Sequence, residues 1–407
     1  MDRTYLPRTL EPVLTRAARE FPAVVLTGPR QSGKTTLLRQ HFARSHSYLS
    51  LEPPDTRAAA AADPRGFLDL WAPPVILDEI QYAPDLLPYI KERIDAQRSR
   101  TGQYLVSGSQ NLLLMQQVAE SLAGRAAVLK LLPLSRRERE GSPGAPLHWE
   151  RTSRIRAETP PAAGSFWRCA LDGGYPELAT DPNRDRSLWF ASYAQTYLER
   201  DVRTLRQVGD LTQFQMFVRA LAARSAQLLN LTDLGRDLGL AINTVKAWVS
   251  VLEASHQIVI LRPHFANVTK RLVKTPKAYF TDSGILCHLV GLKDPAHAAA
   301  GPMAGAIAET VIVSEILKSF WHRGEEPRIS FWRTATGEEV DVLVETAKGL
   351  VPVEVKASAT PTPAMAQNIQ RFRDRVSNVR QDGYVLHTGD IVLPLGQGVT
   401  ALPFRLL

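Results

Sequence analysis

Cysteine is scarce in this chain: among 407 residues only Cys169 and Cys287 occur, far apart and in no C-x-x-C pair. This scarcity argues against a disulfide framework and against a cysteine-ligated structural zinc site. The chain also lacks a run of about 18 apolar residues and the apolar start of a signal peptide. These absences predict a cytoplasmic protein without a membrane span, in which both cysteines are small buried hydrophobes.

The composition is that of a folded protein with an excess of positive charge. Hydrophobic residues make up 44% and charged residues 22% of the chain, which argues against extensive disorder. A chain of this length exceeds what one hydrophobic core usually organises, so we expect about two to four domains. The net charge of +8 favours a polyanionic partner, with nucleic acid first and an anionic membrane surface second.

Four regions differ in their pattern of apolar residues. Residues 1–140 alternate short apolar runs with amphipathic stretches, which predicts a three-layer α/β domain around a parallel sheet. Residues 141–225 begin as an exposed insertion rich in Pro, Gly, Ser and Arg and continue as a helical connector or lid. Residues 226–293 carry a helix-turn-helix pattern, and a linker rich in Pro, Gly and Ala, 294–305, leads to a small α/β domain over residues 300–407. The fold class is therefore α/β.

A phosphate-binding loop is the clearest motif in the chain. The string GPRQSGKT at residues 28–35 fits G-x-x-x-x-G-K-T, follows an apolar strand and precedes an amphipathic helix. In that context backbone N–H groups and the helix N-terminus surround the phosphates. Lys34 is expected to contact the β- and γ-phosphates, and Thr35 to ligate Mg²⁺. The residues predicted to bind the nucleotide are Gly28, Pro29, Arg30, Gln31, Ser32, Gly33, Lys34, Thr35 and Thr36.

Two acids follow the next apolar strand, at residues 75–77. Asp78 is predicted to hold the magnesium ion through water, and Glu79 to polarise the attacking water. The strand after that, 104–107, leads into Ser109 and Gln110, either of which is a candidate sensor of the γ-phosphate. The alternative is that these last two residues only form the turn. The pattern predicts ATP hydrolysis with ATP and Mg²⁺ as cofactors.

A wider resemblance rests on five strings, at residues 26–36, 77–81, 107–110, 120–125 and 197–202. Together they resemble a prokaryotic AAA+ ATPase family whose members carry a C-terminal domain of unknown function, and the resemblance covers almost the whole chain. It implies a homo-oligomer, with a hexamer among the candidates, whose nucleotide site receives an arginine from a neighbouring subunit. Arg125 and Arg200 are the candidates for that arginine, and a surface salt bridge is the alternative role for each.

The third region predicts a DNA-binding unit. Residues 231–238 and 242–253 form two amphipathic helices around a turn, and the second helix would bury Val245, Val249 and Leu252. A strand and a basic segment follow, which together predict a winged helix. The alternative is a lid or an oligomerisation element packed on the ATPase. The side chains expected to contact DNA are Lys246, Lys270, Arg271, Lys274 and Lys277.

Carboxylates and a lysine alternate on the expected strands of the last region. Glu354 and Lys356 are two residues apart on one strand and so share a face, with Asp341 on the neighbouring strand. Together with Glu309 on the preceding helix, they resemble the site of the PD-(D/E)XK nuclease superfamily. Asp341 and Glu354 would bind Mg²⁺, and Lys356 would orient a metal-bound water. The alternative is a catalytically silent fold whose charges form a salt-bridge network.

These predictions combine into one function. We expect an oligomeric AAA+ ATPase that binds and remodels or translocates DNA, including branched DNA, with a metal-dependent nuclease domain at its C-terminus. The alternative is an ATP-gated switch that binds DNA or protein and carries a silent nuclease-like domain.

Overall fold

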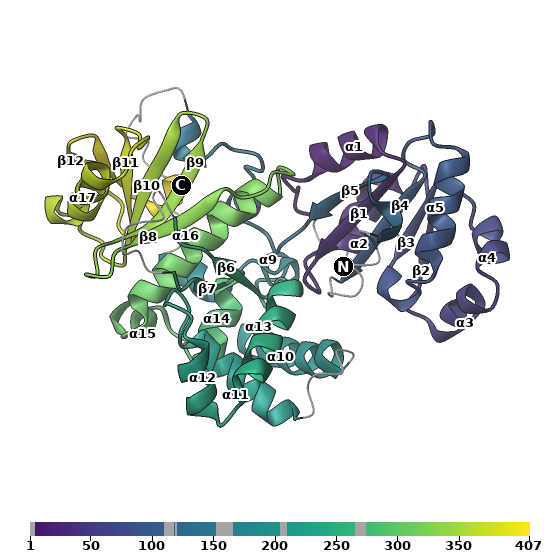
Figure 1. The fold of residues 1–407 in the computed structure, drawn as a ribbon, viewed down its shortest axis with the longest axis horizontal. Helices are drawn as coiled ribbons and strands as arrows, with labels where there is room; N and C mark the ends of the chain where they lie inside the picture. The colour runs from purple at the N-terminus through teal and green to yellow at the C-terminus, as the bar shows by residue number, and fades with distance from the viewer. Residues whose placement is uncertain (1–4, 110–117, 119, 152–165, 204–209, 265–273) are drawn as a thin grey trace.

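The structure is a computed structural model that describes residues 5–109, 118, 120–151, 166–203, 210–264 and 274–407. Figure 1 shows three groups of elements in chain order: an N-terminal sheet with its helices, a middle part dominated by helices, and a C-terminal sheet. None of the helices in these ranges is long and apolar enough to cross a membrane.

The N-terminal part is built on a parallel sheet. Its strands run in the order β2-β3-β4-β1-β5, and every neighbouring pair is parallel. This confirms the predicted parallel α/β domain. The strands are β1 (Ala23–Gly28), β2 (Ser47–Ser50), β3 (Val75–Asp78), β4 (Tyr104–Ser109) and β5 (Ala126–Lys130). The helices are α1 (Glu11–Glu20), α2 (Lys34–Phe42), α3 (Pro54–Ala62), α4 (Pro64–Leu70), η1 (Ile80–Tyr82), α5 (Leu86–Ala96) and α7 (Arg136–Arg139).

Both faces of this sheet are covered by helices. Val24 and Leu26 of β1 belong to a buried cluster with α1 and α2, whereas Val25 belongs to a cluster with α4 and α5. Successive side chains of a strand point to opposite faces, so a strand covered on both sides reads as one continuous apolar run. The domain therefore has three layers, and the carboxyl ends of its strands meet at one edge.

The middle part contains the predicted helix-turn-helix. Asn230 caps α12 by accepting hydrogen bonds from the backbone N–H groups of Thr232 and Asp233, and Gly239 ends the helix in the left-handed region at φ 67°. Val245, Val249 and Leu252 of α13 are buried as predicted. The elements are α8 (Phe166–Asp172), α9 (Pro176–Thr180), α10 (Arg186–Arg203), α11 (Leu211–Ala222), α12 (Leu231–Leu238), α13 (Ile242–Ala254), β6 (Ile258–Leu261), β7 (Lys277–Phe280), α14 (Ser283–Leu289) and α15 (Pro295–Ala300).

Two stretches, one predicted as a linker and the other as an exposed insertion, are partly folded. The linker at 294–305 contains α15, which Asp294 caps by accepting a hydrogen bond of 2.9 Å from the backbone N–H of His297. In the insertion after residue 140, η2 (His148–Glu150) places Trp149 in a buried position against Tyr384. The prediction of an exposed insertion is wrong for this segment, because Trp149 packs against Tyr384, which is remote in sequence.

The C-terminal part is a mixed sheet with the strand order β12-β13-β11-β10-β9-β8. The antiparallel meander β8-β9-β10 follows a helix, as predicted, and β11 then joins β10 in parallel after α17. The bounds are α16 (Ala304–Trp321), β8 (Ile329–Arg333), β9 (Glu339–Thr346), β10 (Gly349–Lys356), η3 (Pro363–Ala366), α17 (Gln367–Arg375), β11 (Gly383–His387), β12 (Leu393–Gly396), β13 (Val399–Pro403) and η4 (Phe404–Leu406).

Helix α16 ties the parts together. It packs against β10 of the C-terminal sheet and against β7, α8 and α14 of the middle part. One buried cluster accordingly extends from Leu147 through the middle helices to Leu407. The two regions predicted as separate units therefore share a hydrophobic core, and α16 is its central element (Figure 1).

Candidate nucleotide site and a second carboxylate cluster

The loop between β1 and α2 has the backbone geometry of a phosphate-binding loop. Gly28 and Gly33 have φ values of 149° and 96°, where a side chain is disfavoured. A Cβ on Gly28 would also lie 2.1 Å from the main-chain oxygen of Leu131. Helix α2 begins at Lys34, so its N-terminal N–H groups face the loop. The sequence predicted this arrangement.

The side chains of the loop fit an anionic ligand. Lys34 is buried and folds back onto its own loop, donating hydrogen bonds of 3.1 and 2.9 Å to the main-chain oxygens of Gly28 and Pro29. The Ser32 hydroxyl is fully buried and has no hydrogen-bond partner among the described residues. A buried hydroxyl without a partner is costly, and the ammonium group of Lys34 can turn from these main-chain oxygens to a phosphate. Both features fit a bound nucleotide.

Asp78, at the end of β3, accepts hydrogen bonds from hydroxyl groups of one helix and two strands. It accepts hydrogen bonds of 2.8 Å from Thr35 and from Tyr48 of β2, and a third from Ser107 of β4. Burial raises the pKa of the Tyr48 phenol, and the bond to Asp78 raises it further, so this hydroxyl stays a donor. The Thr35 hydroxyl and the Asp78 carboxylate are hard oxygen ligands, which fits the magnesium ion that a nucleotide brings.

Glu79 lines the cavity beside the loop. Its backbone is left-handed, with φ 62° and ψ 45°, a conformation that non-glycine residues hold mainly where function or packing imposes it. Its carboxylate accepts a hydrogen bond from the Gln81 amide. The cavity has a volume of about 490 Å³. It is lined by Tyr5, Leu6, Arg8, Gln31, Gly33, Lys34, Thr35, Thr36, Gln40, Glu79, Leu134, Pro176, Glu177 and Thr180.

Arg8 is a site residue that the sequence did not reveal. It donates a hydrogen bond of 2.9 Å to the main-chain oxygen of Ser32 in the loop and one of 2.7 Å to that of Leu132. Its Nε also lies 3.2 Å from Glu138, which in turn is 3.2 Å from Nδ1 of His322 at the end of α16. No local motif marks Arg8, because Leu132 and Glu138 follow it by 124 and 130 residues.

The Arg8–Glu138–His322 group is almost fully buried, with side-chain exposures of 4%, 0% and 1%. Burial alone would raise the pKa of Glu138, but the Arg8 guanidinium and His322 lower it well below its ordinary value. Burial lowers the pKa of His322. The carboxylate is thus the anion that neutralises Arg8 inside the protein, between the phosphate-binding loop and α16.

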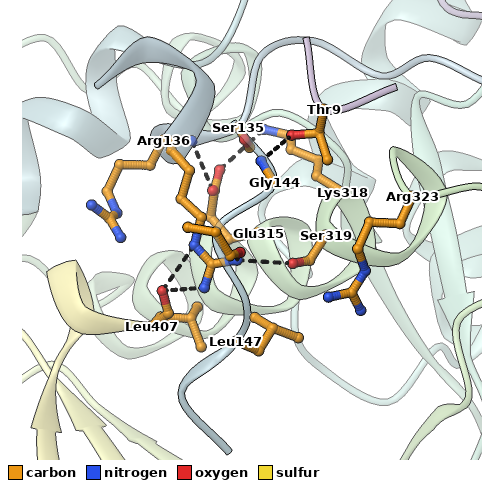
Figure 2. Close-up of a pocket in the computed structure, with 12 residues that line it drawn as sticks. Thr9, Ser135, Arg136, Gly144, Leu147, Glu315, Lys318, Ser319, Arg323 and Leu407 are labelled. Atoms are coloured by element: carbon orange, nitrogen blue, oxygen red, sulfur yellow. Dashed lines mark hydrogen bonds and ion pairs between the residues drawn. The ribbon is translucent and has the colours of Figure 1, made fainter. Parts of the chain in front are cut away.

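A second set of polar contacts joins α7 to α16 and the end of the chain, as Figure 2 shows. Glu315 accepts a hydrogen bond of 2.8 Å from the backbone N–H of Arg136, and Gly144 donates one of 3.1 Å to the Thr9 hydroxyl. Arg137 donates to the main-chain oxygen of Leu407, and burial lowers its pKa to about 10. The cavity between these residues is only about 20 Å³, so the contacts form a packed junction.

The other predicted nucleotide-site residues lie as follows. Ser109 ends β4 directly beside Gly28, because these two residues are partners in the register of β4 and β1. Arg125 lies at the opposite edge of the sheet, where it forms ion pairs of 2.6 and 2.9 Å with Asp95 of the same chain. Arg200 belongs to α10, and its side chain is not among those that the structure describes, whereas Gln110 lies outside the described residues altogether.

Among the described residues, one group of carboxylates could hold a metal ion: Glu309 of α16 with Glu339 and Asp341 of β9. One oxygen of each lies within 4.8 Å of the others. Glu309 and Asp341 were predicted as site residues, whereas Glu339 was not. Glu339 lies two residues from Asp341 on the same strand and therefore on the same face, and this spacing was the available signal in the sequence.

Glu354 and Lys356 of β10 lie beside this group, next to Asp341, as predicted. Lys356 forms an ion pair of 2.7 Å with Oε1 of Glu354, while Oε2 of Glu354 is buried and finds no hydrogen-bond partner among the residues that the structure describes. Asp341 accepts a hydrogen bond of 2.8 Å from the backbone N–H of Val355. Burial, and then the nearby Asp341 charge, raise the pKa of Glu354 to about 8.

The prediction that Lys277 contacts DNA phosphates is wrong for this structure. Lys277 is the first residue of β7, only 2% of its surface is exposed, and it forms an ion pair of 2.7 Å with Glu309 and a second, shorter one with Glu339. Tyr279, two residues later, donates a hydrogen bond of 2.5 Å to the same oxygen of Glu309. Alternation along β7 directs both side chains to the carboxylates.

The other residues predicted to contact DNA divide into two groups. Lys246 on α13 and Lys274 before β7 are exposed. Lys270 and Arg271 lie outside the described residues.

Profiles of known protein families match each of the three parts of the chain. A family profile described as AAA domain matches residues 20–140, and profiles described as domains of unknown function, DUF8612 and DUF4143, match residues 164–296 and 304–407. Uncharacterized protein Rv2008c of Mycobacterium tuberculosis and Uncharacterized protein Mb2031c of Mycobacterium bovis are each 30% identical over 396 residues, which cover 96% of this chain and 82% of the relative.

Among solved structures, the Walker-type ATPase PABY2304 of Pyrococcus abyssi matches 70% of this chain and 96% of its own, with a TM-score of 0.44 and 14% identity. A likeness this distant supports no inference about function. The AAA match, by contrast, spans the loop, Asp78, Glu79 and all five strands of the N-terminal sheet.

Proposed function

This chain belongs to the family of the mycobacterial proteins Rv2008c and Mb2031c and carries an ATPase domain of the AAA type, and from this premise we propose that it couples ATP hydrolysis to the remodelling or translocation of DNA. The observation that carries the ATPase part of the proposal is the convergence of Lys34, Thr35, Asp78 and Glu79 at one edge of the sheet. The DNA part rests on charge and on the exposed lysines of the middle part.

Each residue of the nucleotide site has a distinct task in this proposal. Lys34 turns from the main-chain oxygens of Gly28 and Pro29 to phosphate oxygens. Thr35 and Asp78 would hold a magnesium ion, which would neutralise phosphate charge. Glu79, kept in position by Gln81, orients the water that attacks the γ-phosphorus as the bond to the leaving oxygen breaks. Arg8 binds the main-chain oxygen of Ser32 in the loop and, through Glu138 and His322, fixes the position of the loop relative to α16.

We also propose a homo-oligomer in which an arginine from a neighbouring subunit completes the site. Arg125 lies on the surface at the sheet edge away from its own loop, as such a role requires, although its pairing with Asp95 would have to be released. Arg200 is the other candidate.

We propose that DNA contacts α13 and the segment before β7, which we interpret as parts of a winged helix. Replacing Lys246 and Lys274 together by Ala should weaken binding to all DNA sequences and reduce the slope of log K against log salt by about 1 to 2, because each phosphate contact releases about one counterion. Fluorescence anisotropy over a salt series measures this. The double replacement of Lys293 and Lys348, two exposed lysines elsewhere, is the charge-matched control.

A second measurement tests whether DNA is coupled to the ATPase. Turnover with no DNA, single-stranded DNA, duplex and a four-way junction should differ, and the Lys246 and Lys274 variant should lose the stimulation. Unchanged turnover in all four conditions would favour the alternative, an ATP-gated switch, over a DNA motor.

For the C-terminal domain we propose metal-dependent phosphodiester cleavage, supported by the grouping of Asp341, Glu354 and Lys356 and by the unpartnered oxygen of Glu354. Linear, nicked and junction DNA should be cut under Mg²⁺ or Mn²⁺ in the presence of ATP. Asp341→Ala and Lys356→Ala should each abolish the product but leave ATP turnover intact, whereas Lys348→Ala should change neither. Absence of product from the wild type in every condition would leave a silent nuclease-like domain.

A further inference from the structure

The lysine among the C-terminal carboxylates comes from a different part of the chain. Lys277 lies at the start of β7, which pairs with β6 directly after the helix-turn-helix, whereas the carboxylates belong to α16 and β9. We propose that Glu309, Glu339 and Asp341 form a divalent-cation site that the ammonium group of Lys277 fills in this conformation, so that β7 must withdraw before a metal ion can bind. The inference rests on the cleavage proposed above for the same domain.

The ammonium group occupies the position of a cation. Its Nζ lies 2.7 Å from Oε1 of Glu309 and also contacts Glu339, and Asp341 provides an oxygen within 4.8 Å of theirs. Glu309 and Glu339 are only 13% and 16% exposed, so water can supply little compensation for their charge. Carboxylates in such surroundings require a cation; Lys277 contacts both of them, and Arg333 pairs with the other oxygen of Glu339 at 2.6 Å.

Lysine and a metal ion exclude each other at these oxygens. A divalent ion such as Mg²⁺ that bound one oxygen of Glu309 and one of Glu339 at about 2.0–2.1 Å would lie in the space between these oxygens, and Nζ of Lys277 occupies that space because it contacts both of them. Two positive charges at that separation also repel strongly where water is excluded. Occupation by Lys277 and occupation by metal are therefore alternative states of one site.

A second observation points to a ligand beyond the lysine. Oε2 of Glu354 is buried and has no hydrogen-bond partner in the part of the chain that the structure describes, although the other oxygen of that carboxylate is bound by Lys356 and by Asn368 at 3.2 Å. Glu354 follows Val353, which pairs with Val342 across the sheet, so it lies beside Asp341. Lys277 thus contacts Glu309 and Glu339 and leaves the Oε2 acceptor of Glu354 available to a metal ion.

Mn²⁺ binding to the nucleotide-free protein tests the inference by calorimetry or electron paramagnetic resonance, without any DNA. Lys277→Gln, which keeps a donor of similar length for Glu309, should bind one more Mn²⁺ per chain than the wild type. Adding Glu339→Gln to that variant should remove the gained site. Lys293→Gln, the same change at an exposed lysine that has no place in either proposed site, should behave as the wild type.

Two results would overturn the inference. One is a folded Lys277→Gln protein with no additional site; the other is a wild type that already binds Mn²⁺ through Glu339. If Lys277→Gln does not fold by itself, Mn²⁺ added during refolding should restore the fold, because the ion then supplies the missing positive charge; a failure to do so is equivalent to the first of these results. Because the readout is metal binding, failure to cut DNA does not decide it.

Discussion

Lys34→Ala should lower ATP turnover by about 10²-fold or more and weaken nucleotide binding, because it removes the cation nearest the phosphates. Glu79→Gln should behave differently: it should retain ATP affinity and lose about 10² to 10⁴ in turnover, because only the group that orients the water is neutralised. Phosphate release and binding of a fluorescent ATP analogue separate the two effects.

Glu20→Gln provides the matched control for the second variant, since Glu20 is an exposed carboxylate at the end of α1. It should change neither quantity. Turnover at the wild-type rate in Glu79→Gln would show that another group orients the water, and Asp78 would then be the next carboxylate to replace.

Glu138→Ala should lower the free energy of unfolding by about 3–5 kcal/mol, because it leaves the Arg8 guanidinium buried without its anion. Urea unfolding followed by tryptophan fluorescence measures the change. Glu92→Ala removes an ion pair with Arg65 in which both side chains are more than half exposed, and it should have a much smaller effect. Equal effects of the two changes would contradict the central role of the buried group.

The same carboxylate predicts a pH dependence. The pKa of Glu138 is lower in the folded state than in the unfolded state, so its stabilisation is fully present above the unfolded pKa and is lost as the pH falls through the folded one. The lowered pKa of His322 acts in the same direction, because below its ordinary pKa the unfolded chain binds the proton more readily. Stability should therefore fall on acidification, and Glu138→Gln should flatten that fall.

The sequence by itself determined the features that depend on local order. The loop at 28–35, the acids after β3, the two helices around Gly239 and the helix followed by three strands were all predicted, because each is specified by residues close together in the chain. The same holds for the parallel N-terminal sheet, since strands buried on both faces are apolar throughout. A local motif carries its geometry with it, so its residue types and spacing suffice.

Only the tertiary structure decided which charges meet. Arg8 reaches Glu138, which follows it by more than a hundred residues, and Lys277, which looks like one more base in a basic segment, turns inward to Glu309 and Glu339. The residue types permit either outcome, because a lysine is stable both in water and beside buried carboxylates. Which one occurs depends on how α16, β7 and β9 pack, and that packing is a property of the whole hydrophobic core.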